Sequence, residues 1–212
     1  MHSHIKILQR VVSKKRTGKE LSFSMPHVFK AINILYNEKY VSRATLCREL
    51  HLGEGSIKTL IKHLKELEII SIIKSGTFLT TKGRNIAEKF QESIPSCHLL
   101  KDCKLTGFRY TNAVLLRDFS NHLGNGLEQR DFAILYGAKE VFTFVFKKEN
   151  FVFPKENIDG FSNDRKTKDI MIEKLNPQKN DVVIITSSND KFEAELSGIN
   201  SALCTIASHD KH

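Results

Sequence analysis

Residues 42–67 read SRATLCRELHLGEGSIKTLIKHLKEL, and this stretch decides the fold of the first half of the chain. Ser42 can cap a helix that runs to about Leu50. Gly53 and Gly55 then break the helical pattern and predict a turn. Two helices joined by a short turn are therefore expected.

The second of these helices, expected over residues 55–67, has one apolar face and one polar face. Its apolar residues recur at i, i+3, i+4, i+7 and i+10, namely Ile57, Leu60, Ile61, Leu64 and Leu67. Its outer face would carry Ser56, Lys58, Thr59, Lys62 and His63. No acidic residue lies between Glu54 and Glu66, so this face would not repel phosphate. A helix of this type, braced by another, is what a helix-turn-helix places in the major groove.

The pattern continues in both directions from this pair of helices. Pro26 suits the first turn of a preceding helix that runs to Asn37. After the pair, residues 69–79 predict two short strands around the turn Lys74-Ser75-Gly76, and a last helix ends before Pro95. The order helix, helix, turn, helix, hairpin, helix predicts a winged helix-turn-helix domain over residues 23–96.

Nine side chains of this domain are expected to face duplex DNA. They are Arg43, Ser56, Lys58, Thr59, Lys62, His63, Lys74, Ser75 and Thr77. The recognition helix would read base edges, whereas the first turn of the bracing helix and the hairpin tip would meet the phosphate backbone or the minor groove. Two alternatives remain open. The helix can be a solvated amphipathic helix, or the domain can be a protein-interaction module.

The distribution of charge supports a polyanionic partner for the first half only. Residues 1–96 hold 17 Lys and Arg against 8 Asp and Glu, whereas residues 97–212 hold 16 of each. The whole formal excess of +9 therefore lies in the first half. Residues 1–22, which include Lys14-Lys15-Arg16, are interpreted as a flexible basic arm or a solvated tail.

Several other features bound the class of protein. No apolar run is long enough to cross a bilayer and no signal peptide is visible, so a cytoplasmic location is expected. The four cysteines are too few for a disulfide framework, and Cys97, His98 and Cys103 lack a second pair at ligand spacing. No cofactor, metal or catalytic motif is recognised, so we do not expect an enzyme; an active site within residues 97–212 remains the less favoured alternative.

Residues 97–212 predict a second domain of mixed α+β or α/β type. Strands are expected at 113–116, 141–146, 151–153 and 181–185, and helices at 127–136 and 164–175. A last helix is expected to carry Phe192, Leu196, Ile199, Leu203 and Ile206 on one face. This domain would bind a small effector, mediate dimerisation, or both. A homodimer is expected because two recognition helices gain specificity by binding two half-sites.

Two segments of the second domain are candidates for binding a small-molecule or anionic effector. In the first, a glycine-rich turn opens a helix, with Gly126, Gln129, Arg130 and Asp131 as the candidate residues. The alternative is a loop followed by a structural Arg130–Asp131 pair. The second follows a buried strand and contains Ser187, Ser188 and Asn189, which can equally be simple helix caps.

The motifs of the first domain resemble those of a known group of proteins. Residues 42–50 and 52–56 look like the helix-turn-helix of bacterial and archaeal winged-helix regulators, and Leu79-Thr80-Thr81-Lys82-Gly83 resembles the step that follows the wing. The usual glycine after the recognition helix is Ile69 here, so the entry to the wing can differ in shape.

The whole chain resembles an archaeal family of winged helix-turn-helix transcriptional regulators with a C-terminal domain of unknown function. Residues 126–131 and 181–185 look like recurring segments of that second domain. The resemblance implies a DNA-binding transcriptional regulator of α+β class, with an N-terminal winged helix-turn-helix domain and a C-terminal mixed α/β domain over residues 97–212.

Overall fold

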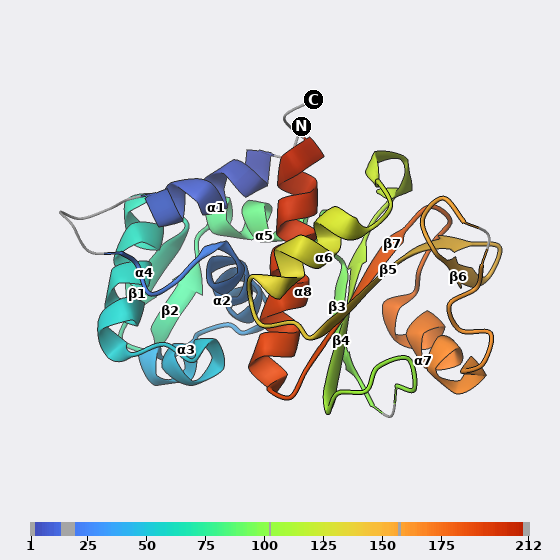
Figure 1. Cartoon of the computed structure of the whole chain (residues 1–212). Coiled ribbons are helices and arrows are strands. Elements are labelled where there is room, and N and C mark those ends of the chain that lie inside the picture. The colour runs from blue at the N-terminus through green and yellow to red at the C-terminus, as the bar shows by residue number, and fades with distance from the viewer. Residues whose placement is uncertain (1–2, 14–19, 102, 157, 210–212) are drawn as a thin grey trace. The chain divides into compact units, whose positions relative to one another are not determined.

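The computed structural model describes residues 3–13, 20–101, 103–156 and 158–209 (Figure 1). The chain divides between Phe90 and Gln91 into two compact units, which are described separately below. The first unit consists mainly of helices with a two-stranded sheet, and the second contains a five-stranded sheet. This composition confirms the predicted α+β class. Among the described helices, none is both long and apolar enough to span a membrane.

The first unit has the expected order of helices and strands. Its elements are α1 (Ser3–Ser13), α2 (Met25–Asn37), α3 (Arg43–Leu50), α4 (Glu54–Glu66), β1 (Ile70–Ile73), β2 (Gly76–Leu79) and α5 (Thr81–Ser93), the last of which runs across the division between the units. The Ser42 side chain accepts a hydrogen bond from the Thr45 amide at 3.0 Å and so caps α3, as predicted. Ser56 lies in the first turn of α4, which begins two residues earlier.

The N-terminal arm is the main correction to the sequence prediction. Residues 3–13 form α1 and are not a flexible arm. Ile5, Leu8 and Val11 are buried at helical spacing, and α1 packs against α2 and α4. Burial of these three side chains offsets the entropy lost when the segment becomes ordered. The basic run Lys14-Lys15-Arg16 lies outside the described residues.

The start of α2 is held by a capping box that uses a histidine. The Nδ1 atom of His27 accepts a hydrogen bond from the Ser24 amide at 3.3 Å and lies 2.9 Å from the Ser24 hydroxyl. Burial, with a smaller effect from the charge of Lys30, lowers the pKa of His27 to about 4. His27 is therefore neutral at pH 7, as an acceptor at this position must be.

The hairpin is attached to the helical core through the segment between α2 and α3. β1 and β2 pair in antiparallel register, and Thr77 forms a bridge with Val41, with both N–O distances at 2.9 Å. Gly76 has a φ of +139°, and a Cβ there would lie 2.8 Å from the Val41 carbonyl oxygen. Only glycine fits both this backbone conformation and this contact.

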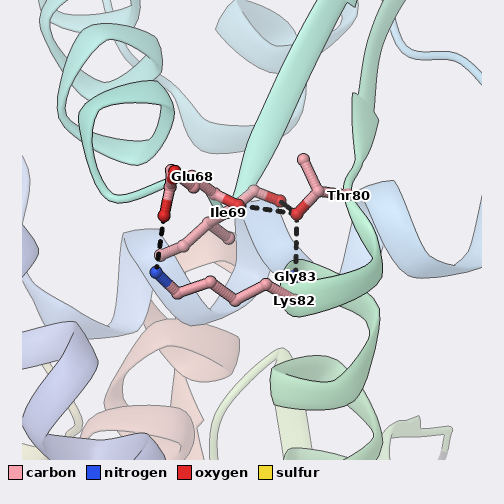
Figure 2. Close-up of polar contacts among 5 residues, drawn as sticks. All are labelled: Glu68, Ile69, Thr80, Lys82 and Gly83. Atoms are coloured by element: carbon pink, nitrogen blue, oxygen red, sulfur yellow. Dashed lines mark hydrogen bonds and ion pairs between the residues drawn. The ribbon is translucent and has the colours of Figure 1, made fainter.

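The end of α4, the hairpin and the start of α5 meet at one junction (Figure 2). The Thr80 hydroxyl donates to the carbonyl oxygens of Glu68 at 2.6 Å and Ile69 at 3.1 Å, and accepts from the Gly83 amide at 3.0 Å. Lys82 pairs with Glu68 across the same junction at 3.3 Å. A Cβ on Gly83 would lie 2.0 Å from the Ile69 carbonyl oxygen. The junction therefore requires glycine at position 83.

The second unit is a five-stranded antiparallel sheet with helices on both faces. Its elements are β3 (Ser96–Leu100), β4 (Tyr110–Leu116), the short 3-10 helix η1 (Ser120–His122), α6 (Leu127–Ile134), β5 (Glu140–Lys147), β6 (Asn150–Val152), α7 (Arg165–Leu175), β7 (Val182–Ser188) and α8 (Lys191–His209). The strand order is β3-β4-β7-β5-β6. β3 was not predicted from the sequence.

The helices of the second unit pack on opposite faces of its sheet. Met171 and Leu175 of α7 join a cluster of phenylalanine and aliphatic side chains on one face. α8 covers β4 and β7 on the other face, and α6 packs against α8 and β5 (Figure 1). A Cβ on Gly198 would lie 2.9 Å from both Thr186 Oγ1 and Val114 Cγ2. Glycine at this position therefore lets α8 approach the sheet closely.

We expect Gly83→Ala to destabilise the first unit, because the added methyl group has no space beside the Ile69 carbonyl. The cost should be about 1–3 kcal/mol or more, the range for overpacking a closely packed site. Urea unfolding of the full chain measures it. Gly55→Ala is the matched control, since a Cβ at that position meets nothing within 4 Å. Equal stability of the two variants would contradict the expectation.

The low pKa of His27 predicts a pH-dependent loss of stability. In the unfolded chain His27 should titrate near its ordinary pKa of 6.5, whereas in the folded chain the value is about 4. Its contribution is therefore fully present above pH 6.5 and is lost as the pH falls toward 4. His27→Gln keeps a side-chain acceptor for the Ser24 amide without a titrating group.

We therefore expect the unfolding free energy to fall less for His27→Gln than for the parent chain between pH 7 and pH 4.5. Urea titrations at both values test this difference. Identical losses in the two chains would show that His27 does not titrate in this way.

Candidate nucleic-acid interface

Except for His63, α4 divides its residues between the core and the solvent as its periodicity predicts. The four apolar side chains Ile57, Leu60, Ile61 and Leu64 are buried. On the other face Lys58 and Lys62 are exposed, and Ser56 and Thr59 are half-buried. The Thr59 hydroxyl donates to the Gly55 carbonyl at 3.0 Å, so its oxygen keeps the capacity to accept a further hydrogen bond.

The lysines of α4 form a line along the exposed face. Lys65 is also exposed and stands seven residues after Lys58, so Lys58, Lys62 and Lys65 share one side of the helix. The sequence prediction omitted Lys65, although its spacing places it in this row. Lys62 forms an ion pair with Glu66 at 3.7 Å, with both side chains more than 40% exposed. An exposed pair of this kind is weak and exchanges readily for another anion.

Two further parts of the predicted interface are accessible. Arg43 is the first residue of α3 and is exposed beside the Ser42 cap. Lys74 and Ser75 are exposed in the turn between β1 and β2. Ile72 and Ile73, just before this turn, are 41% and 45% exposed, so the hairpin end also presents apolar surface. The sequence prediction did not single out these two isoleucines.

Two of the nine predicted contact residues are buried, and the prediction is wrong for them. The Nδ1 atom of His63 lies 2.8 Å from the Val11 carbonyl oxygen, and its ring packs edge-on against Phe23. His63 therefore holds α1 against α4. Thr77 is 3% exposed and lies where β2 bridges Val41. Neither side chain reaches the surface of the unit.

In the second unit, Gly126 and Gln129 border a hollow of about 420 Å³. The lining residues are His122, Gly124, Asn125, Gly126, Glu128, Gln129, Lys155, Ser208 and His209. Gly126 precedes α6 with a φ of +90°. The rings of His122 and His209 are 3.6 Å apart between centroids. Within the described residues, the buried Gln129 Oε1 and Thr143 Oγ1 atoms have no hydrogen-bond partner.

Arg130 and Asp131 are separate from this hollow. Both side chains are exposed on α6, and they pair with each other at 3.1 Å. This arrangement agrees with the structural pair that the sequence left open. The residues predicted as one effector site therefore lie on two different sides of α6.

The other predicted effector segment points mainly inward. Ser187 and Ser188 are fully buried in β7, whereas Asn189 is exposed. The Ser188 hydroxyl donates to Glu193 at 2.6 Å, and the Ser187 hydroxyl lies 3.5 Å from a Glu140 oxygen. These carboxylates would repel an anion. The sequence prediction for this segment rests on the tendency of ligands to gather at the carboxyl ends of the strands in α/β folds. That tendency belongs to parallel sheets, whereas every strand pair of this sheet is antiparallel.

The two candidate segments of the second unit also do not come together. Ser188 bonds to the first turn of α8, whereas the hollow beside Gly126 is lined by Ser208 and His209 at its last turn. A helix of 19 residues is about 28 Å long. The described residues contain no group of three or more His, Cys, Asp or Glu that could hold a metal ion.

Comparisons with known proteins match each half of the chain separately. Residues 31–85 match the model of the PH0730-like N-terminal domain, and residues 108–206 match a domain of unknown function, DUF4443. This agrees with the expected C-terminal domain of unknown function. A comparison with curated proteins finds no match.

One similar solved structure is the hypothetical protein PH0730 from Pyrococcus horikoshii OT3. The two sequences are 24% identical, the TM-score is 0.72, and the alignment covers 88% of this chain and 95% of the other. The likeness to an archaeal protein agrees with the expected archaeal resemblance. At this identity it shows a shared fold, in which an N-terminal helical domain precedes a domain built on a sheet.

Proposed function

We propose that the chain is a DNA-binding transcriptional regulator whose first unit is a winged helix-turn-helix domain. In this proposal α4 enters the major groove, α3 braces it, and the β1–β2 hairpin is the wing. The observation that carries the proposal is the face of α4, where three exposed lysines stand in a row and no carboxylate interrupts residues 55–65. The archaeal resemblance of the sequence motifs points to the same function.

The charge of this face suits the backbone of a duplex. Lysines that neutralise phosphates release counterions, which gives affinity and a strong dependence on salt. Lys58 and Lys62 would contact phosphate or guanine, and Lys65 would contact the backbone. Ser56 and Thr59 carry hydroxyl groups that can donate to or accept from base edges. Specificity would therefore come from the first two turns of α4.

Arg43 and the hairpin would extend the contact on either side of α4. Arg43, at the start of α3, is placed to bind a phosphate. Lys74 and Ser75 at the hairpin tip would meet the adjacent backbone or the minor groove. Ile72 and Ile73 add apolar surface, which favours contact with sugars at that position or, in a second candidate function, with a protein partner.

The second unit would bind the effector that regulates DNA binding, or it would mediate dimerisation. Its formal charge is close to balanced, so it adds little attraction for DNA. The hollow beside Gly126 combines Lys155, two histidine rings and the start of α6, which suit a small anionic effector, whereas Glu128 in the same lining opposes one. Binding there would act on α6 and on the end of α8.

We expect Lys58→Ala/Lys62→Ala to weaken binding to genomic DNA fragments and to reduce its salt dependence. If both lysines contact phosphate, the slope of log affinity against log salt should fall by about two. Fluorescence anisotropy at several salt concentrations measures both quantities. Selection of bound genomic fragments would also identify the target sequences.

Lys6→Ala/Lys89→Ala is the matched control, because it removes the same charge from exposed positions on α1 and α5. This control should leave the affinity close to that of the parent chain. An equal effect of both double variants would indicate only a general charge effect. Binding that does not depend on salt, or on either pair, would overturn the proposal and favour a protein partner.

A further inference from the structure

α6 is held on the second unit by its inner face. Gln129 and Ala133 are buried there against α8. The Gln129 amide nitrogen donates to Thr205 at 3.1 Å, the Ser201 hydroxyl donates to the Gln129 carbonyl at 2.7 Å, and the Asn200 amide donates to the Phe132 carbonyl at 2.8 Å. These bonds fix the helix, so its outer face is presented to solvent in a set orientation.

That outer face is apolar at both ends. Leu127 is 48% exposed and Ile134 is 52% exposed, and their spacing of seven residues places them on one side of the helix. Leu135, the next residue, is 75% exposed. Single exposed apolar residues are common on protein surfaces, but a row of large ones on a short rigid helix is typical of a contact surface.

The centre of the same face carries two opposite charges, which sum to zero. Arg130 and Asp131 lie midway between Leu127 and Ile134, and their side chains are 51% and 65% exposed. Their ion pair therefore separates two apolar ends. A partner for this face must offer apolar side chains at the ends and charges of both signs in the middle.

We propose that the outer face of α6 pairs with the same face of a second copy of the chain. A twofold interface brings one surface against itself, so the surface must be complementary to itself. Because Arg130 and Asp131 lie at the centre, any such pairing brings the two ion pairs together at the axis. Each Arg130 then lies within reach of the partner's Asp131, while the apolar ends cover one another.

The inference deepens the proposed function, because a dimer would carry two recognition helices to two half-sites. It rests on the second unit alone, however, and can be measured without DNA. The contact surface of one short helix is small, which predicts a dimer that forms reversibly with rising concentration. If the chain did not bind DNA, its self-association could still be measured. If the chain did not dimerise, Lys58, Lys62 and Lys65 would still be available to bind DNA.

Charge variants of the full chain test the pairing by sedimentation velocity over a range of concentrations. Arg130→Asp alone would place four carboxylates at the axis, and Asp131→Arg alone would place four guanidinium groups there. Each variant should weaken self-association tenfold or more, because like charges would face each other. Mixed in equal amounts, the two variants should associate with each other, since the two carboxylates of one variant then face the two guanidinium groups of the other.

Matched controls lie on α7, on the opposite face of the sheet. Lys166→Asp and Asp169→Arg make the same charge changes at exposed positions and should leave self-association unaltered. Leu135→Asp should weaken it by removing one apolar end. A parent chain that stays monomeric at all concentrations, single charge variants that associate as the parent does, or a mixture that fails to associate would each overturn the proposal.

Discussion

The close contact between Gly83 and the Ile69 carbonyl is the constraint on which the arrangement of the first unit depends. A Cβ at position 83 would come within 2.0 Å of that oxygen. The same carbonyl accepts hydrogen bonds from the Thr80 amide and hydroxyl. This set of contacts ties the end of α4 to the hairpin and to the start of α5. The direction of the hairpin relative to α4 is therefore set by a few backbone groups.

The exposed face of α4 depends on how thoroughly its other face is committed to the core. Four apolar side chains and His63 are buried along the helix, and His63 also holds α1 through the Val11 carbonyl. The lysines are consequently presented by a helix that cannot rotate without exposing this apolar surface, which would cost several kcal/mol. Burial of the apolar face of α4 therefore both stabilises the fold and fixes the positions of Lys58, Lys62 and Lys65.

The second unit uses different means to present its surfaces. Gly198 lets α8 approach the sheet, and hydrogen bonds of Gln129 with Thr205 and Ser201 join α6 to α8. The inner face of α6 buries Gln129 and Ala133, and Leu127 and Ile134 are exposed on its outer face. The same helix borders the hollow near Gly126 at its start. Binding in the hollow and pairing through α6 would therefore involve one rigid element.

The sequence by itself determined the elements whose periodicity is strong and local. The stripe of α4, the Ser42 cap, the glycine at the hairpin turn and the buried strand β7 were all predictable, because each depends on neighbours within a few residues. The exposure of Lys58 and Lys62 followed from the same stripe. The helix over residues 3–13 was missed, although Ile5, Leu8 and Val11 already stand at helical spacing.

Only the tertiary structure decided which polar residues reach the surface. His63 and Thr77 occupy positions that look external along the chain, yet α1 covers the first and the bridge to Val41 covers the second. Likewise, Arg130 and Gln129 are adjacent in sequence, but Gln129 is buried against α8 whereas Arg130 is exposed. Burial is set by segments distant in the chain, here 52 residues apart for Val11 and His63. Local patterns hold no information about such partners.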